Sequence, residues 1–449
     1  MRKLFASLAV LLAPLSLALT PSPAQDLFDQ ASFYIEFYYN GPSTLDLKGL
    51  SAKYQAQLDT ACAADKDKCA FEKAVPLIES MIEELQDNHT YYQSPEDLGR
   101  TQAGRQGTQR STVLRIGLTH RAIEGSRDRL VMDVVENGPA FEAGIQYGDR
   151  ITAVNGRSLS ELASDEAVVQ FLNQQVQSGN PVTLSITRGT AREKIELRLT
   201  GKDIALARFP SIRYLANNVA VLKIPEFFPQ GQVGVRVHQL VAEAQRRNAR
   251  GIILELRGNP GGSALDALIA MAAFVDNPSV TFRDRYATQS TTYLIRGQQA
   301  VIQNAEGTVL NRLPIQGFAR WNGPVVVLVD RGSASGAEYL ASALQRVGVK
   351  VIGEATTGIG NTTTQTFNLI NGGGINISYN RAFFADGSSY VAQVRPDIAG
   401  SLDIAVLANQ GRDNVIDQAL QTMGVAATLP NSLDFGAYLR PNYSLAFAR

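Results

Sequence analysis

The chain has 449 residues, of which 45% are hydrophobic and 19% charged, with 42 basic and 42 acidic side chains. This length is too great for one ordinary hydrophobic core, so two or three domains are expected in a soluble globular protein. Because the opposite charges cancel, the sequence lacks the broad positive field with which proteins bind nucleic acid or an anionic membrane surface, and neither partner is expected.

The first residues are typical of a secretory signal peptide, assigned to 1–24. Two basic residues precede an apolar run over 4–19, and a Pro-Ser-Pro-Ala stretch follows. Ser22 and Ala24 are small residues at the separation required for cleavage before Gln25. No other segment has enough consecutive apolar residues to span a bilayer. We therefore expect the mature protein to be periplasmic or secreted, without an integral membrane segment.

The segment 25–110 is expected to form a helical N-terminal domain, because apolar positions such as Ile78 and Ile82 recur at helical spacing. It holds the only two cysteines of the chain, Cys62 and Cys69. An exported protein meets an oxidising compartment, so a disulfide closing this short loop is expected, with two unpaired thiols as the alternative. A metal site is not expected, because the chain has only three histidines and none lies near this pair.

Short alternating strands with one interleaved helix, at 166–176, are predicted over 111–201. The stretch Asn-Gly-Pro-Ala-Phe-Glu-Ala-Gly-Ile-Gln-Tyr-Gly-Asp-Arg-Ile-Thr-Ala-Val-Asn-Gly at 137–156 resembles a PDZ domain. In that family a strand, here near 114–118, and the helix form a groove that binds a peptide as an added strand, and backbone amides bind its terminal carboxylate. The resemblance implies a carboxylate loop of Arg115, Ile116, Gly117 and Leu118. A purely structural role for this module is the alternative.

From 202 to 400 the pattern changes to continuous apolar strands that alternate with amphipathic helices, which implies a sheet covered on both faces. The expected strands are 219–224, 251–256, 324–329 and 350–352, and the expected helices are 233–246, 265–275 and 337–347. The segment 401–449 is expected to form a helical tail, with one helix over 413–423, that packs over the domain surface.

Two strand ends in this α/β domain carry residues suited to acyl-transfer chemistry. The sequence Asp-Arg-Gly-Ser-Ala-Ser-Gly-Ala-Glu at 330–338 leads from a strand into a helix, where the amides of the first turn can stabilise an oxyanion. Helix capping by Ser333 or Ser335 is the alternative. The sequence Arg-Gly-Asn-Pro-Gly-Gly at 257–262 exposes backbone N–H groups after another strand, unless it is only a tight turn. We expect the two turns to face one cleft.

Together the two turns resemble the carboxyl-terminal processing peptidases and their tricorn-like relatives, which are serine peptidases with a PDZ domain before a crotonase-like α/β domain. The resemblance runs from the helical leader to about residue 398. It also includes Val-Ala-Val-Leu-Lys-Ile-Pro-Glu-Phe at 219–227, Gly-Glu-Ala-Thr-Thr-Gly-Ile-Gly at 353–360, and the ending from Asp386-Gly387 to Arg-Pro-Asp at 395–397.

This resemblance implies an α/β crotonase-like catalytic domain at 202–400 with an inserted PDZ-like module. It also implies that Ser335 is the nucleophile. The oxyanion would bind to the amides of Gly336 and of Gly261 or Gly262.

The general base departs from the pattern of the processing peptidases. Their lysine lies in a Gly-Lys-Gly loop, which here reads Gly-Ile-Gly with Ile359 in the lysine's place. Lys350 is eight residues upstream of Gly358, with no evident route for its amine to Ser335. The tricorn-like branch uses a histidine before the catalytic domain, and Asp-Asn-His-Thr at 87–90 resembles its Asp-x-His-Thr motif, which implies His89 as base. A structural role for His89 is the alternative.

A third catalytic member is not assigned. The tricorn-like branch has a glutamate where this chain has Tyr390, and Asp386, Asp87 or Tyr390 are the candidates for orienting His89. His120 and His238 are interpreted as structural.

These features lead to one main hypothesis and two alternatives. The main hypothesis is a serine peptidase, an endopeptidase or tail-specific enzyme that needs no cofactor and binds polypeptides through their C-termini. The first alternative is a non-catalytic relative that binds peptides or another ligand and has lost the lysine. The second is an acyl-CoA enzyme, against which export and the PDZ module argue. The sequence leaves the oligomeric state open.

Overall fold

The structure, a computed structural model, describes residues 21–108, 113–136, 138–189 and 192–425. These residues form two compact units: the residues up to 95 together with 366–377, and residues 96–365 together with those from 378 onward. The predicted apolar leader over 4–19 and the end of the predicted tail lie outside the described residues.

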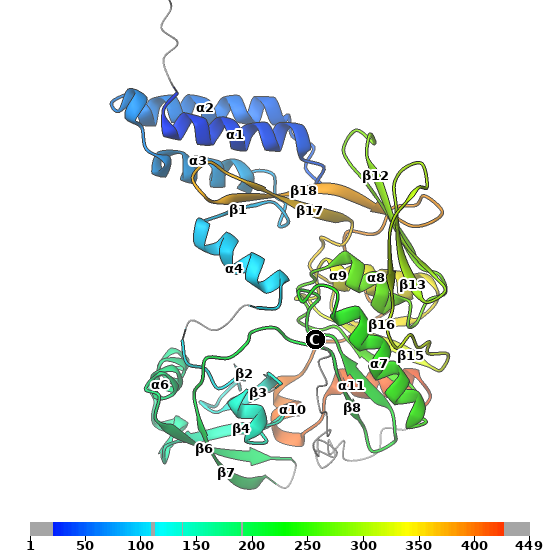
Figure 1. Cartoon of the computed structure of the whole chain (residues 1–449). Coiled ribbons are helices and arrows are strands. Elements are labelled where there is room, and N and C mark those ends of the chain that lie inside the picture. Colours follow the sequence, from blue (N-terminus) through cyan, green and yellow to red (C-terminus); the bar gives the residue numbers. More distant parts are fainter. Residues whose placement is uncertain (1–20, 109–112, 137, 190–191, 426–449) are drawn as a thin grey trace, which may run out of the picture. The chain divides into compact units, whose positions relative to one another are not determined.

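The first unit is a small helical core, as the apolar spacing predicts (Figure 1). It contains α1 (Pro23–Tyr38), α2 (Leu47–Cys62), a short 3₁₀ turn (Lys66–Lys68), α3 (Phe71–Glu83) and β1 (Tyr91–Gln93). β1 pairs in antiparallel register with the start of β18 (Gly374–Phe383). Ile375 and Ile377 of β18 are fully buried among the apolar faces of the helices. The sequence did not predict this contribution from a segment almost 300 residues away.

The predicted cleavage point before Gln25 falls inside α1. The Ser22 hydroxyl accepts a hydrogen bond from the Gln25 amide at 3.2 Å and caps this helix. Ala24 is fully buried, and its amide donates to the Cys69 carbonyl at 3.0 Å. The described fold therefore uses residues that the boundary at 24 assigns to the leader.

The second unit begins with α4 (Pro95–Arg105) and continues into an antiparallel sheet with strand order β2-β3-β4-β6-β7. Its strands are β2 (Leu118–Ala122), β3 (Arg129–Val134), β4 (Arg150–Val154), β5 (Arg157–Ser158), β6 (Pro181–Arg188) and β7 (Glu193–Thr200). Its helices are α5 (Pro139–Glu142), a 3₁₀ turn (Leu159–Glu161) and α6 (Asp165–Gln177). The apolar side of α6 packs on the sheet through Val168, Leu172 and Val176.

The first strand of this sheet differs from the prediction near 114–118, because it begins only at Leu118. Gly117 has a φ of +77°, so the chain turns there before it enters the strand. The carbonyls of Ile116 and Gly117 accept hydrogen bonds from Ala140 and Val135 at 2.7 and 2.8 Å. These bonds fix residues 116 and 117 as a loop.

The α/β part is built on a six-stranded sheet with strand order β19-β16-β15-β10-β9-β8, all parallel except β8. The strands are β8 (Ser211–Tyr214), β9 (Ala220–Lys223), β10 (Ile252–Glu255), β15 (Val325–Val329), β16 (Lys350–Gly353) and β19 (Ile398–Ala399). The helices are α7 (Val233–Arg246), α8 (Ala264–Met271), α9 (Gly336–Arg346), α10 (Ile404–Gln410) and α11 (Asn414–Thr422).

Both faces of this sheet are covered, which confirms the expectation from its apolar strands. Residues of α7, α8 and α9 pack on one face, and residues of α11 such as Val415 and Ile416 pack on the other. The carboxyl ends of the parallel strands therefore converge at one edge, where ligands bind in open α/β sheets.

An antiparallel meander was not predicted. It contains β11 (Ser279–Arg283), β12 (Ser290–Arg296), β13 (Gln299–Gln303) and β14 (Val309–Pro314), and β11 also pairs with the end of β18, which in turn pairs with β17 (Thr362–Asn368). Only some inward positions, such as Val280 and Val301, are buried, so these strands lack the continuous apolar runs of the parallel sheet. None of the helices in the described part of the chain is both long and apolar enough to cross a membrane.

The first prediction concerns Cys62 and Cys69. Their Cα atoms lie 5.4 Å apart and their sulfurs are paired, which is the geometry that a disulfide requires. Oxidation of this pair in the protein stays a prediction. Mass spectrometry of the unreduced protein should find no alkylatable thiol, and Cys62→Ser with Cys69→Ser should lower the free energy of unfolding by about 2 kcal/mol, because the closed loop is short. Two thiols that alkylate without reduction would contradict this expectation.

Candidate active site

Ser335 lies at the elbow between β15 and α9. Its φ of +50° and ψ of −110° belong to a region that non-glycine residues rarely adopt. Such strain persists only where the surroundings impose it, and it is frequent at functional sites. The hydroxyl-bearing side chain is partly exposed, whereas Ser333 is fully buried and its Oγ donates to the Leu256 carbonyl at 2.9 Å. Ser333 therefore has a structural role, and Ser335 is the serine that a substrate can reach.

The glycine turn at 257–262 packs directly against this elbow. A Cβ atom on Gly261 would lie 2.7 Å from the Ser335 Cβ and 2.9 Å from the Gly336 amide nitrogen. Asn259 is fully buried; its carbonyl accepts from the Ala334 amide at 2.9 Å, and its Nδ2 donates to the Ile224 carbonyl at 2.8 Å. The two turns that the sequence predicted to share one cleft are thus in contact.

The amides near Ser335 differ in their availability for an oxyanion. The Gly261 amide already donates to Asn259 Oδ1 at 2.8 Å. Within the described residues, the amides of Gly262 and Gly336 donate no hydrogen bond. Gly336 is the first residue of α9, where amides have no intrahelical acceptor. Gly336 and Gly262 are therefore better placed as donors than Gly261.

Glu338 ties the elbow to the following loop. Its side chain is fully buried, and it accepts hydrogen bonds from the Ser335 amide at 2.8 Å, the Gly358 amide at 2.8 Å and the Ile359 amide at 3.1 Å. The Thr356 hydroxyl also donates to it. Burial raises the pKa of Glu338, while these four donors oppose the shift. One carboxylate thus fixes both the backbone of Ser335 and the loop at 356–359.

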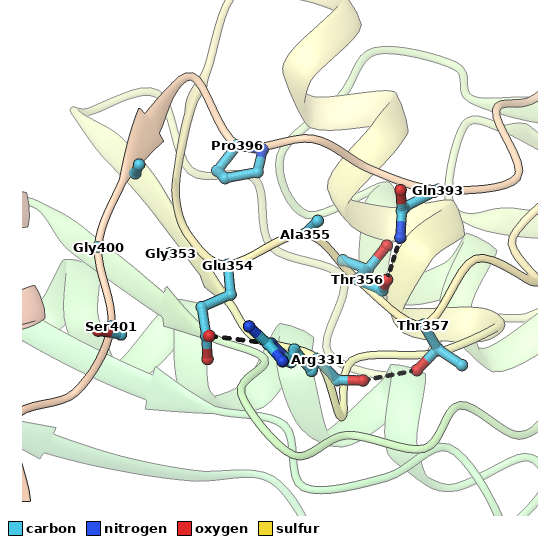
Figure 2. A pocket seen from close by; sticks show the side chains of 11 residues that line it. Arg331, Gly353, Glu354, Ala355, Thr356, Thr357, Gln393, Pro396, Gly400 and Ser401 are labelled. Carbon is cyan, nitrogen blue, oxygen red and sulfur yellow. Dashed lines mark hydrogen bonds and ion pairs between the residues drawn. The ribbon is translucent and has the colours of Figure 1, made fainter.

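The other side of this loop lines an open depression of about 880 Å³ at the carboxyl ends of β15, β16 and β19 (Figure 2). Arg331 forms an ion pair with Glu354 at 3.1 Å there, and the Gln393 side chain donates to the Thr356 carbonyl at 2.8 Å. Thr356 therefore connects the wall of the depression to Glu338.

Neither lysine position supplies a base in the α/β domain. Ile359 contributes its amide to Glu338, and its side chain carries no titratable group. Lys350 lies level with Val326 at the amino end of the parallel strands, whereas Ser335 follows their carboxyl end. The Lys350 ammonium group is exposed and pairs with Asp397 at 3.7 Å.

His89 belongs to the first unit and Ser335 to the second. His89 is 8% exposed, and burial lowers the pKa of its imidazole to about 4, against the opposing charge of Asp87. The Asp87 carboxylate accepts from the His89 amide at 3.0 Å and from the Thr90 hydroxyl at 2.8 Å. The His89 carbonyl accepts from Asn376 at 2.8 Å. These bonds hold the segment 87–90 in a defined conformation within its own unit.

The remaining candidates for orienting His89, and the two other histidines, lie in environments that differ from one another. Tyr390 is buried against Phe384 and Tyr339, with ring centroids 3.7 and 5.2 Å away, and Asp386 is exposed. Both ring nitrogens of His238 lie within 2.9 Å of backbone carbonyls in the core. His120 lies on β2, where burial lowers its pKa.

The predicted peptide-binding residues lie beside the start of β2, an edge strand of its sheet. Ile116 is buried in one cluster with Leu172 and Val176 of α6, and Leu118 packs against that cluster. Arg115 is exposed and pairs through its backbone with Lys202. An edge strand beside an apolar helix face is the arrangement on which strand addition depends.

Ser335, in a strained conformation, lies against the glycine turn, and comparisons with known proteins show what this part of the chain is similar to. Residues 218–399 match the model of peptidase family S41, and residues 115–199 match that of the PDZ domain. The chain is 26% identical over 288 residues to the carboxy-terminal processing protease CtpA of Bacillus subtilis (strain 168), covering 64% of this chain and 55% of that protein.

Two further proteins are similar to the chain. A carboxyl-terminal-processing protease of Synechocystis sp. is 28% identical over 316 residues, covering 68% of this chain and 66% of that protein. The fold is similar to the crystal structure of a putative S41 protease from Bacteroides fragilis NCTC 9343, with a TM-score of 0.55, 16% identity, and 88% and 96% of the two chains covered. The matched region spans between half and two thirds of the two curated relatives. The matches to the S41 peptidase and PDZ models, together with these relatives, confirm the resemblance seen in the sequence.

The second prediction concerns Glu338. Glu338→Gln replaces a carboxylate that accepts from four donors by an amide whose NH₂ group faces backbone N–H groups. The free energy of unfolding should fall by about 3 kcal/mol, measured by chemical denaturation. Glu354→Gln, near the loop that Glu338 binds but partly exposed, is the matched control and should change the free energy of unfolding by less than about 1 kcal/mol. Equal effects of the two substitutions would show that Glu338 does not fix the elbow.

Proposed function

We propose that this chain is an exported serine peptidase that hydrolyses polypeptides through an acyl-enzyme at Ser335. The supporting observation is the strained Ser335 elbow against the glycine turn, within a domain of peptidase family S41. Ser335 Oγ attacks the carbonyl carbon of the scissile peptide bond, and its proton passes to the base. The amides of Gly336 and Gly262 donate to the resulting oxyanion. The amine leaves with the proton, and water then hydrolyses the ester.

His89 is proposed as the base. Ile359 cannot accept a proton, and Lys350 lies at the opposite end of the strands. A histidine whose pKa is about 4 is neutral at pH 7 and therefore able to accept the Ser335 proton. The proposal requires His89 Nε2 to come within hydrogen-bond reach of Ser335 Oγ in the working enzyme.

The substrates are proposed to be exported polypeptides whose carboxyl termini bind at the PDZ domain. Two relatives are named as carboxyl-terminal processing proteases, and the predicted carboxylate loop of this chain precedes an edge strand. The periplasmic or secreted location, the signal peptide and the crotonase-like classification of the α/β domain belong to the same proposal.

The third prediction tests Ser335 and His89. Ser335→Ala and His89→Ala should each lower kcat for an unfolded protein substrate by at least about 1000-fold, and the double variant should lose no more, because nucleophile and base act as one unit. Lys350→Ala is the control and should retain the parent rate. Because burial lowers the pKa of His89 to about 4, kcat/KM should stay level from pH 7 to about 5.5 and fall only on further acidification.

These measurements test the role of His89 as base separately from the peptidase activity itself. Serine-dependent hydrolysis that survives His89→Ala would contradict the base. A parent protein without any Ser335-dependent hydrolysis would contradict the peptidase itself.

The fourth prediction tests the carboxylate loop. A peptide with an apolar last residue and a free carboxylate should bind at least about tenfold more tightly than the same peptide with a terminal amide, because only the carboxylate accepts from the loop amides. Calorimetry with Ser335→Ala avoids cleavage during the titration. Leu172→Lys, on the α6 face, should weaken both complexes. Equal affinities for acid and amide would contradict the assignment of 115–118.

A further inference from the structure

A cluster of ionisable side chains is buried where the PDZ domain contacts the peptidase domain. Arg257 Nη2 lies 2.7 Å from Asp413 Oδ2, and Arg257 Nε donates to Glu255 Oε1 at 2.8 Å. The Tyr147 hydroxyl donates to Asp413 Oδ2 at 3.0 Å. The charged side chains are at most 12% exposed. A buried guanidinium group between two carboxylates is strongly held, because removal of one partner leaves an uncompensated charge.

The members of this cluster come from three separate parts of the second unit. Tyr147 belongs to the PDZ domain, between α5 and β4. Asp413 caps α11 and also accepts from the amides of Val415 and Ile416 at 3.1 and 3.2 Å. Arg257 is the first residue of the glycine turn. Donors on several sides therefore fix the Asp413 carboxylate, which in turn fixes Arg257.

The protonation states of the cluster agree with these roles. Burial by itself raises the pKa of Asp413, but Arg257 and the other donors hold it below its ordinary value, so the carboxylate is charged. Burial and the charge of Asp413 raise the pKa of Tyr147, so its hydroxyl keeps the proton that it donates.

A second group of ionic contacts connects the PDZ domain to the residues that hydrogen-bond to the end of the glycine turn. Asp133 of the PDZ strand β3 pairs with Lys223 at 2.7 Å and with Arg208 at 3.6 Å, and Arg208 Nε donates to Glu226 at 3.1 Å. Glu226 precedes Phe227, whose amide donates to the Gly261 carbonyl at 2.7 Å and whose carbonyl accepts from Ser263 at 2.9 Å. The turn is thus linked to the PDZ domain on both sides, through Asp413 on one and through Arg208 and Glu226 on the other.

We propose that Arg257, Asp413 and Tyr147 are positioning residues that align the glycine turn with Ser335, so that the PDZ domain contributes a side chain to the alignment of the oxyanion site. The proposal rests on the peptidase function proposed above. The reaction rate is sensitive to the position of the oxyanion donors, because a displacement of a donor by about 1 Å can lower the rate about 100-fold. Arg257 is only four residues from Gly261, so a change in the position of Arg257 can displace the donors of the turn.

The test uses Tyr147→Phe, which removes one hydroxyl and retains the ring. Asp417→Asn is the matched control, because it removes the carboxylate charge from the Arg412–Asp417 pair of 2.7 Å, an ion pair that involves α11 but is separate from the Arg257–Asp413 pair. The protein is treated with a small fluorophosphonate, which reacts with Ser335 and carries no peptide that could bind in the PDZ groove. A quenched peptide substrate gives kcat and KM separately. Hydrogen exchange is followed in the peptide that covers 257–263.

Tyr147→Phe should slow labelling of Ser335 and lower kcat, each by about tenfold, with KM changed by less than about twofold. It should also speed exchange in 257–263, while Asp417→Asn changes none of these. Parent-like labelling and exchange in Tyr147→Phe would overturn the proposal, as would equal effects of the two variants. If the parent protein does not label at Ser335, the peptidase function fails, and exchange alone decides whether Tyr147 positions the turn.

Discussion

The site depends on one buried carboxylate. Glu338 accepts from the Ser335 amide on one side and from the amides of Gly358 and Ile359 on the other. Burying this charge is costly, and only several good donors make it tolerable. The donors come from two segments, the elbow at Ser335 and the loop at 358–359. Each segment therefore keeps its conformation only while the other also binds the carboxylate. The φ of +50° at Ser335 is maintained in this way.

The same bond explains how the loop at 358–360 keeps its shape without the lysine of the processing peptidases. The loop offers backbone amides to Glu338, and any residue except proline at position 359 can provide that donor. Isoleucine at position 359 therefore provides the backbone donor to Glu338, although its side chain cannot accept a proton. If His89 is the base, proton acceptance and support of the elbow come from different parts of this chain.

The sequence predicted the elements that have a local signal. The strands at 324–329 and 350–352 and the helices at 233–246 and 337–347 follow from apolar periodicity. The elbow with Ser333 and Ser335 follows from small residues between a strand and a helix, and the choice of Ser335 follows from the family resemblance. The meander β11–β14 lacks continuous apolar runs, and the 366–377 segment packs in a unit far from it in sequence. Glu338 has partners 18 to 21 residues away, and Tyr147 contacts Asp413 across 266 residues. No local pattern encodes such contacts.

Burial lowers the pKa of His89, so its ring is neutral at pH 7 but is also a weaker base than an exposed imidazole. With a pKa of about 4 the ring is a poor proton acceptor in the ground state, so the step becomes feasible only if the imidazolium is stabilised as it forms. Within the first unit Asp87 is the charge that acts in this direction, since it raises the pKa of His89 against the effect of burial. Tyr390 stands where the tricorn-like branch has a glutamate, and it is enclosed by aromatic rings. If His89 is the base, Asp87 is therefore the better source of the negative charge that such a glutamate would provide.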